Sequence, residues 1–290
     1  MFSSKKSKFK QKLSWHSAKI PTHFHLNPSD ITLPKGTKLL DKGHFGQIYK
    51  AKYKGKDVAI KTVKFTSNDN SDFMASIEMF VEECEISLQL GRHKHVLQYV
   101  GIYFPEKMPK FNNLIEENMS FLDLPCLVSN FMPKGNMLKY LDDSRLKDFT
   151  VYKAITFCSQ LANGMKYLQH HKINHADLAC RNLLLDAELT VKISDFGLSQ
   201  KGLEYNYGFM IEQNIHHDND MNNDQNIKMS TIENPHQVQR CFPIWWSAIE
   251  VQENKKITNF SDVWSFGVTA WEIFARGLRH SAVKWVKKRT

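Results

Sequence analysis

Side chains that could handle a phosphoryl group stand at three separate places in the chain. A lysine ends the apolar run from Val58 to Lys61, and an aspartate and an asparagine, Asp177 and Asn182, lie five residues apart. Thirteen residues after Asn182 comes the aspartate of the tripeptide from Asp195 to Gly197. Phosphoryl transfer depends on gripping phosphates, holding Mg²⁺ and aiming a hydroxyl, and it asks for little covalent help from the protein. A lysine, two carboxylates and an amide are the kinds of groups that such chemistry uses.

A glycine-containing segment precedes the lysine, from Leu39 to Ile48. Because Gly43 and Gly46 have no side chains, backbone N–H groups there can come close to phosphate oxygens. Asp41 lies two residues before Gly43 and would bring a carboxylate toward the same phosphates. The alternative is an ordinary hairpin that uses glycine to turn. By itself the segment does not decide between a phosphate cradle and a turn.

The segments together resemble the catalytic domain of protein kinases, from about Leu39 to Ile273. Three passages are similar to tyrosine kinases in particular. Leu178–Asn182 reads L-A-C-R-N, close to their L-A-A-R-N, and Phe242–Trp246 reads F-P-I-W-W, close to their L-P-V-K-W. Ser261–Val268 reads S-D-V-W-S-F-G-V, as in their helix of that wording. The chain is therefore identified as resembling a protein tyrosine kinase.

The resemblance implies a catalytic role for four residues. Asp177 would accept the proton of the substrate hydroxyl, and Arg181 would orient a tyrosine substrate. Lys61 would pair with Glu83 on the helix that follows it. The competing acids on that helix are Glu82 and Glu85.

The resemblance also implies ATP and Mg²⁺ as cofactors, with Asn182 and Asp195 as the metal ligands. The ATP-binding positions that it implies are Leu40, Gly43, Phe45, Gly46, Ile48, Ala59, Lys61, Asn130, Met132 and Leu184. The implied partners are protein substrates that present a tyrosine.

Periodic patterns predict the elements that must position these groups. β-Branched and aromatic residues between glycines predict twisted antiparallel strands over 31–63, and a further strand over 127–131. Apolar residues at three- and four-residue steps predict helices over 77–88, 155–168 and 263–273.

These elements, with the resemblance, imply an α+β fold: a two-lobed protein kinase fold with a small antiparallel-sheet N-lobe, one helix in that lobe and a mainly helical, truncated C-lobe. The expected division is a basic flexible arm over 1–27, the N-lobe over 28–132 and the C-lobe over 133–290. The C-lobe would hold the catalytic loop, a long activation loop and incomplete C-terminal helices.

The chain departs from the family pattern at several points. Ala176 stands where an arginine usually clamps a phosphorylated activation loop, so activation by phosphorylation of Tyr205 or Tyr207 should be weakened. The polar stretch 212–239 is expected to be flexible, and its His216–Asp220 is read as disordered rather than as a metal site. The apolar stripe of 263–273 is expected to be partly bare, because the family's following helices are missing. A nucleotide-binding pseudokinase or scaffold module with weak or no catalysis is therefore the alternative function.

Composition excludes several classes of protein. The 290 residues are 42% hydrophobic, which is enough for a full core and excludes disorder or a collagen-like chain. The formal net charge is +9 without a nucleic-acid-binding motif, so no nucleic-acid partner is expected. The five cysteines form no CxxC pair, which argues against a disulfide framework or a zinc site and favours a reducing, cytoplasmic compartment.

The location stays open between two alternatives. Ala248–Glu250 and Gly267–Ile273 resemble the Axl and Mer receptor tyrosine kinases, which would make this chain the intracellular portion of a plasma-membrane receptor. The basic arm would then contact the inner leaflet, since lysines are attracted to anionic lipid. No run of eighteen apolar residues is present, so no membrane-spanning helix is expected within these residues. The alternative to the receptor is a non-receptor cytoplasmic kinase.

Overall fold

The computed structural model describes residues 19–34, 39–42, 46–63, 70–105, 124–143, 149–202, 204–206, 210–211, 227–230, 241–254 and 256–276. The chain divides into two compact units. The first comprises residues 1–91 and 98–131, and the second comprises residues 92–97 and 132–290. The short segment 92–97 thus packs with the second unit although the first unit flanks it on both sides in the sequence.

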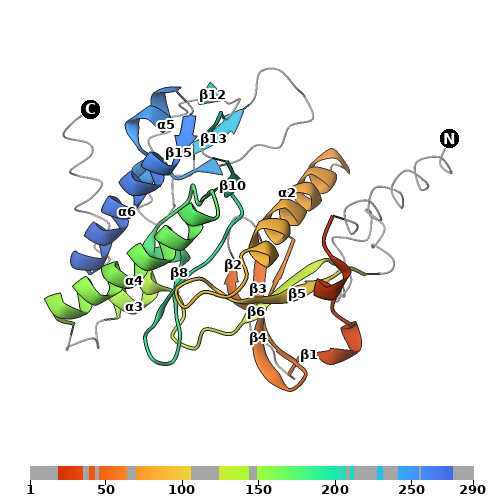
Figure 1. The fold of residues 1–290 in the computed structure, drawn as a ribbon. Coiled ribbons are helices and arrows are strands. Elements are labelled where there is room, and N and C mark those ends of the chain that lie inside the picture. The colour runs from red at the N-terminus through yellow and green to blue at the C-terminus, as the bar shows by residue number, and fades with distance from the viewer. Residues whose placement is uncertain are drawn as a thin grey trace, which may run out of the picture. The chain divides into compact units, whose positions relative to one another are not determined.

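The first unit is built on a six-stranded antiparallel sheet with one helix after its fourth strand (Figure 1). The strand order is β1-β3-β4-β6-β5, and β2 pairs with the first half of β3. The strands are β1 (Ile31–Thr32), β2 (Leu39–Lys42), β3 (Gln47–Tyr53), β4 (Lys56–Thr62), β5 (Tyr99–Tyr103) and β6 (Cys126–Asn130). The helix is α2 (Asn70–Gln89), and the short 3₁₀ turns before β1 are Thr22–Phe24 and Pro28–Asp30. This confirms the predicted antiparallel sheet with one helix.

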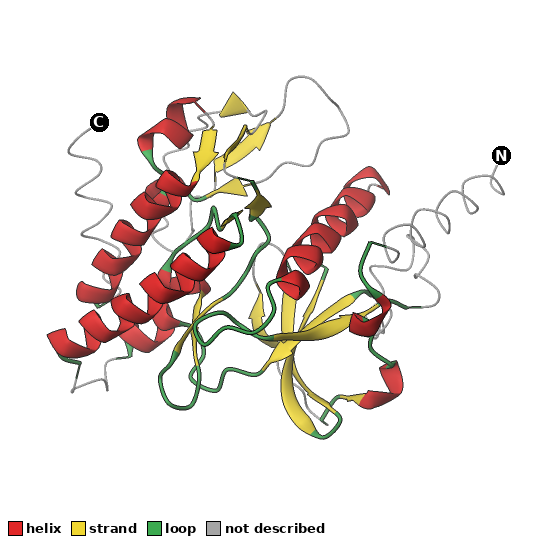
Figure 2. Cartoon of the chain, in the orientation of Figure 1, coloured by secondary structure: helices red, strands yellow, loops and turns green. Residues whose placement is uncertain are grey.

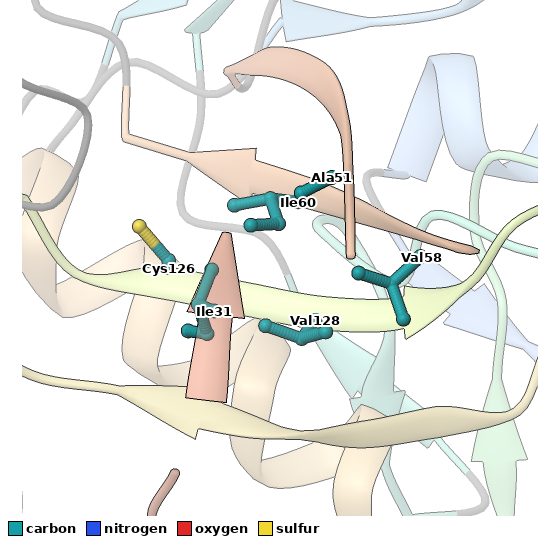
Figure 3. Close-up of a cluster of buried hydrophobic side chains, with 6 residues drawn as sticks. All are labelled: Ile31, Ala51, Val58, Ile60, Cys126 and Val128. Carbon is teal, nitrogen blue, oxygen red and sulfur yellow. The ribbon is translucent and has the colours of Figure 1, made fainter. Parts of the chain in front are cut away.

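Alternation along β4 decides which of its side chains face the core. Val58, Ile60 and Thr62 are buried, whereas Ala59 and Lys61 between them are half-buried. Because successive side chains of a strand point to opposite faces, Lys61 projects from the face opposite the buried cluster. Figure 3 shows that cluster, which consists of Ile31, Ala51, Val58, Ile60, Cys126 and Val128.

The second unit is mainly helical, as the red ribbons of Figure 2 show, with short paired strands. Its helices are α3 (Met137–Asp142), α4 (Val151–His170), α5 (Ile249–Asn254) and α6 (Asn259–Phe274), and its 3₁₀ turns are Cys180–Asn182 and Ile244–Trp246. Its antiparallel pairs are β7 (Ile173–Asn174) with β10 (Gln200–Lys201), β8 (Leu183–Leu185) with β9 (Val191–Ile193), and β11 (Glu204–Asn206) with β15 (Lys256–Thr258). A three-stranded sheet consists of β12 (Met210–Ile211), β13 (Ile227–Ser230) and β14 (Cys241–Phe242).

Segment 92–97 is hydrogen-bonded to β9 and lies close to α4. The Leu97 N–H donates to the Ile193 carbonyl at 2.8 Å, and the Ile193 N–H donates to the His95 carbonyl at 3.0 Å. Gly164 in α4 makes the close approach possible, because a Cβ there would lie 2.6 Å from the Ile193 Cδ1 and 2.8 Å from the His95 carbonyl oxygen. Strand β5 begins only at Tyr99, since the backbone groups of His95 and Leu97 are already paired with β9.

Helix α6 buries a face that is mostly polar. Its buried residues include Ser261, Asp262, Ser265, Thr269 and Glu272, which are all polar. Its apolar stripe is partly exposed, as the sequence predicts: Val263 is exposed, and Phe266 and Ala270 are half-buried. The helix begins with a capping box in which the Thr258 hydroxyl accepts from the first turn and the Ser261 hydroxyl accepts from the Thr258 N–H at 2.8 Å. The polar face of α6 is therefore available to bind backbone groups elsewhere in this unit.

One part of the predicted flexible stretch 212–239 is structured, so that prediction is wrong for residues 227–230. Strand β13 pairs with β12 through Ser230 and Met229, and with β14 through Ile227 and Lys228. Backbone hydrogen bonds to a strand on each side can order a polar segment that has few apolar side chains. The remainder of 212–239, with His216–Asp220, lies outside the described residues, as do Tyr207 and the basic arm up to residue 18.

Candidate active site

In the first unit, β4 and α2 bring a lysine and a glutamate together. The Lys61 Nζ lies 2.6 Å from the Glu83 Oε1, and only 14% of the lysine side chain and 3% of the glutamate side chain are exposed. Glu82 is exposed, and Glu85 accepts a hydrogen bond from Gln89 on its own helix. Of the three acids that the sequence offers, the one beside Lys61 is therefore Glu83. The pair holds the ammonium in place on the face of the sheet opposite the Val58–Ile60 cluster.

The register of the sheet places further predicted ATP-binding residues on the same face. Ile48 pairs with Lys61 across β3 and β4, and Ala59 lies two residues from Lys61 along β4, so all three side chains share one face. Gly46 has a structural reason to be glycine, because a Cβ there would lie 2.3 Å from the Thr62 carbonyl oxygen. Leu40 and Asn130 are exposed in this unit. Gly43 and Phe45 lie outside the described residues, and Met132 and Leu184 are half-buried in the second unit.

In the second unit, the 3₁₀ turn Cys180–Asn182 folds back on Asp177. The Asn182 Nδ2 donates to the Asp177 Oδ2 and to its carbonyl oxygen, both at 2.7 Å. The Arg181 guanidinium contacts the other carboxylate oxygen, Oδ1. Burial raises the pKa of Asp177 and the nearby Asp195 adds to this, while Arg181, His175 and Asn182 oppose it. The result is a buried carboxylate that is oriented by a donor at each oxygen.

The backbone just before Asp177 is held by a buried carboxylate of α6. The Asp262 Oδ2 accepts from the His175 N–H at 2.6 Å, and its Oδ1 accepts from the Ala176 N–H at 2.9 Å. Ala176 has a φ of 64°, a left-handed conformation that a residue with a Cβ adopts only at a cost of about 1–2 kcal/mol. Asp262 therefore holds the loop in a conformation that it would not adopt alone.

His175 links this loop to the segment that carries Asp195. Its Nδ1 accepts from the Asp177 N–H at 3.2 Å, so its Nε2 is the nitrogen that donates, and it does so to the Ser194 carbonyl at 3.1 Å. The His175 ring also packs on Phe196, with 5.3 Å between ring centres, and both side chains are fully buried. Asp195 follows Ser194 with a φ of 65° and is half-buried. These contacts fix the two loops that carry the predicted metal ligands.

The two predicted metal ligands fit Mg²⁺ by their chemistry. Because carboxylate oxygens only accept hydrogen bonds, the amide nitrogen of Asn182 must face Asp177, which leaves its Oδ1 for another partner. Asp195 lies near enough to Asp177 to raise the pKa of that carboxyl. Mg²⁺ takes hard oxygen ligands, usually one or two from the protein with water and substrate phosphate for the rest. In the described part of the chain, no three His, Cys, Asp or Glu side chains gather as a fuller metal site.

Glu272, which sequence reasoning did not single out, supports the loop from a second point on α6. Its Oε2 accepts from the Cys180 N–H at 2.9 Å and from the Trp246 indole N–H at 2.9 Å, and only 2% of the residue is exposed. Asp262 belongs to the S-D-V-W passage, but that motif does not predict its hydrogen bonds. Both are acids in a helix whose other faces are apolar, and that contrast is the signal that could have found them.

Glu272 also sets a pH dependence of stability. Burial raises the pKa of its carboxyl above the usual 4.5, although its hydrogen bonds and Arg181 oppose this. The folded state therefore holds the proton more tightly than the unfolded state, so this contribution to stability is present at low pH and is lost as pH rises through the raised pKa. In the Glu272→Gln variant one amide oxygen can accept the same two hydrogen bonds without titrating. We expect this variant to gain stability relative to the unsubstituted protein as pH rises from about 4 to about 8.

Urea unfolding of both proteins across that pH range measures the difference in unfolding free energy. A difference that stays constant with pH would contradict the raised pKa.

Comparisons with known proteins identify sequences related to this chain. The family model for protein tyrosine and serine/threonine kinases matches residues 35–215 and 218–288. The tyrosine-protein kinase receptor TYRO3 of Danio rerio is 31% identical over 249 residues, which cover 83% of this chain and 24% of that protein. The Ack-related non-receptor tyrosine kinase of Caenorhabditis elegans is 32% identical over 245 residues, covering 83% and 19%. Protein-tyrosine kinase 6 of Mus musculus is 30% identical over 241 residues, covering 83% and 42%.

The chain thus spans less than half the length of these curated relatives. The relatives include receptor and non-receptor tyrosine kinases. The family model covers nearly all of the described residues, including the Lys61–Glu83 pair and the loop around Asp177. By its motifs, its fold and these matches, the chain belongs to the protein tyrosine and serine/threonine kinase family and contains the kinase domain of that family, with tyrosine kinases among its relatives.

Proposed function

We propose that this domain transfers the γ-phosphate of ATP to tyrosine hydroxyls of protein substrates and acts in signal transduction. The observation that carries the proposal is the buried Asp177 carboxylate, whose two oxygens face Arg181 and Asn182. A carboxylate fixed in this way can accept the proton of an attacking hydroxyl. Two observations favour tyrosine over serine or threonine as the acceptor: the tyrosine-kinase-like motifs at residues 178–182 and 242–246, and the tyrosine kinases among the relatives.

The other residues have supporting roles in this proposal. Lys61, held by Glu83, would neutralise charge on the phosphates of ATP, with Leu40, Ile48, Ala59, Asn130, Met132 and Leu184 around the nucleotide. Asn182 and Asp195 would hold Mg²⁺, which neutralises charge on the phosphate oxygens when it is bound. Arg181 would orient the tyrosine ring and hydroxyl toward Asp177.

The direct test is phosphate incorporation from Mg²⁺-ATP into a tyrosine-containing polymer, beside a matched polymer that contains serine in place of tyrosine. We expect incorporation into the tyrosine polymer, and a loss of about 10²-fold or more in Lys61→Met, because preorganised charge at the phosphates is a large term in such reactions. Equal incorporation into both polymers would contradict tyrosine specificity. Incorporation that is equal in the wild type and in Lys61→Met would contradict the enzyme itself.

The alternative is a nucleotide-binding pseudokinase or scaffold module, favoured by Asp41 in the glycine segment and by Ala176 before Asp177. Such a module would be stabilised by Mg²⁺-ATP without transferring phosphate. A ligand at about 100 times its Kd raises unfolding free energy by about 2.7 kcal/mol, which a thermal melt detects. Stabilisation without incorporation would therefore decide for the alternative.

For the location we propose a cytoplasmic site of action, either as a non-receptor kinase or as the intracellular portion of a plasma-membrane receptor. Among the described residues, no helix is both long and apolar enough to cross a membrane. The relatives comprise both kinds of protein. The lysines of the arm over 1–27 would favour contact with anionic lipid of the inner leaflet, a contact that added salt would weaken.

A further inference from the structure

Arg181 lies on the 3₁₀ turn Cys180–Asn182 and contacts the Asp177 carboxylate. Its side chain also has a second neighbour. The guanidinium carbon lies 4.6 Å from the centre of the Trp246 ring, within the distance at which a cation is attracted to the face of an aromatic ring. Trp246 belongs to the 3₁₀ turn Ile244–Trp246, far from Arg181 in sequence. The arginine side chain therefore lies between a carboxylate and an indole.

The indole itself is fixed from behind. Its N–H donates to the Glu272 Oε2 at 2.9 Å, and the same oxygen accepts from the Cys180 N–H at 2.9 Å. Glu272 is a buried residue of a helix of sixteen residues, so it is a rigid anchor for both donors. The Glu272 Oε2 thus binds both Cys180, the residue before Arg181, and Trp246, whose ring packs on Arg181.

These contacts restrict a side chain that would otherwise be mobile. Arginine has about 2 kcal/mol of rotamer entropy, and only a quarter of the Arg181 side chain is exposed, at 25%. The contact with Asp177 alone fixes the end of the guanidinium, whereas the indole restricts the plane in which it lies. A guanidinium that is held both at its end and in its plane keeps one orientation relative to Asp177.

We propose that Trp246 is a positioning residue for the transfer reaction: its indole, fixed by Glu272, holds the Arg181 guanidinium against Asp177 in the orientation that receives the substrate. The inference rests on the proposed function and deepens it, since it assigns a residue outside the catalytic loop to the arrangement of that loop. Trp246 does not touch the reacting atoms and acts only through Arg181.

The test is a double-substitution cycle on kcat/KM for a tyrosine peptide. Trp246→Leu removes both the ring and the N–H, and we expect a loss of about 5- to 30-fold, the range that corresponds to a partly buried cation–π contact. In an Arg181→Met background the same substitution should cost less than about twofold, because the group that Trp246 positions is already gone. A role in folding alone would give the same loss in both backgrounds.

Two further variants keep the test independent of folding. Trp246→Phe retains an aromatic face and should recover most of the lost kcat/KM, although it loses the hydrogen bond to Glu272. Trp245→Leu changes the neighbouring indole of the same turn, and its effect should be equal in the two backgrounds. The kcat should fall more than the KM of ATP changes, because the nucleotide is held by other residues.

A signal from the arginine separates this inference from the proposed function. The ring current of an indole above Arg181 shifts the NMR resonances of the arginine side chain, and Trp246→Leu should remove that shift while Trp245→Leu leaves it. If the wild type transfers phosphate but the two substitutions are additive, only the role of Trp246 is overturned. If the wild type transfers none, the proposed function fails and the positioning role falls with it, even where the NMR shift confirms the contact.

Discussion

Replacement of Asp177 by asparagine is expected to lower kcat for tyrosine phosphorylation by about 10²- to 10⁴-fold, the usual contribution of a positioned proton acceptor. The amide cannot take the hydroxyl proton, and its NH₂ group must face one of the two donors, Arg181 or Asn182, that now bind the carboxylate. The binding of ATP should change little, because the ammonium of Lys61 is unaffected. Steady-state kinetics with a tyrosine peptide measure kcat and both KM values.

The matched control for this prediction is Asp57→Asn. Asp57 is an exposed acid of β4 that pairs with Lys50 at 2.7 Å and with Lys52 at 3.1 Å. Exposed pairs of this kind contribute about 0–1 kcal/mol, so kcat should stay within about twofold of the unsubstituted protein. The Asp177 prediction fails if the asparagine variant keeps more than about a tenth of the original kcat.

Replacement of Asp262 by alanine is expected to cost about 2–5 kcal/mol of unfolding free energy and at least about 10²-fold in kcat. Two buried backbone N–H groups, those of His175 and Ala176, would lose their acceptor, and each costs about 1–3 kcal/mol when it stays buried and unpaired. Burial raises the pKa of Asp262, so removal of a buried acid offsets part of this loss. The loop would then leave the left-handed conformation at Ala176 and move Asp177.

Urea unfolding and kcat are measured on the same preparations, with Ala176→Gly as the companion variant. Glycine adopts a φ of 64° without strain, so this substitution should raise the unfolding free energy by up to about 1 kcal/mol while Asp262 is present. Glu253→Ala, an exposed acid of α5, is the control for loss of negative charge. An Asp262→Ala protein that is as stable and as active as the original would show that the loop holds its conformation without α6.

Local patterns predicted the elements of the fold. The alternation in β4 and the three- and four-residue spacing in α2 and α4 are short-range signals, because each side chain is placed relative to its own backbone within a turn or two residues. The same applies to the pair of Asp177 and Asn182, which are close in sequence and meet in one turn of the chain. Local spacing could not choose between Glu82 and Glu83, because they are neighbours on the same helix. Only the resemblance to the kinase motif selected Glu83.

The supporting groups could not be predicted in this way. Asp262 meets His175 across 87 positions of the chain, and Glu272 meets Cys180 across 92. The partial exposure of the apolar stripe of α6 was predicted, but the burial of its polar face, with Asp262 and Glu272, was not. The ordered strand Ile227–Ser230 was missed for the same reason, because its hydrogen-bonding partners lie in other segments.

The sequence by itself determined the kinds of groups available for chemistry, their order and the elements on which they lie, because these depend on residue type and local spacing. Only the tertiary structure decided how those groups are held. Asp177 is oriented by its neighbours in the chain, but the loop that carries it keeps its strained conformation through Asp262, and Arg181 keeps its direction through Trp246 and Glu272. The physical reason is that a buried polar group must find a partner in space, and only the complete fold sets which groups come within about 3 Å of each other.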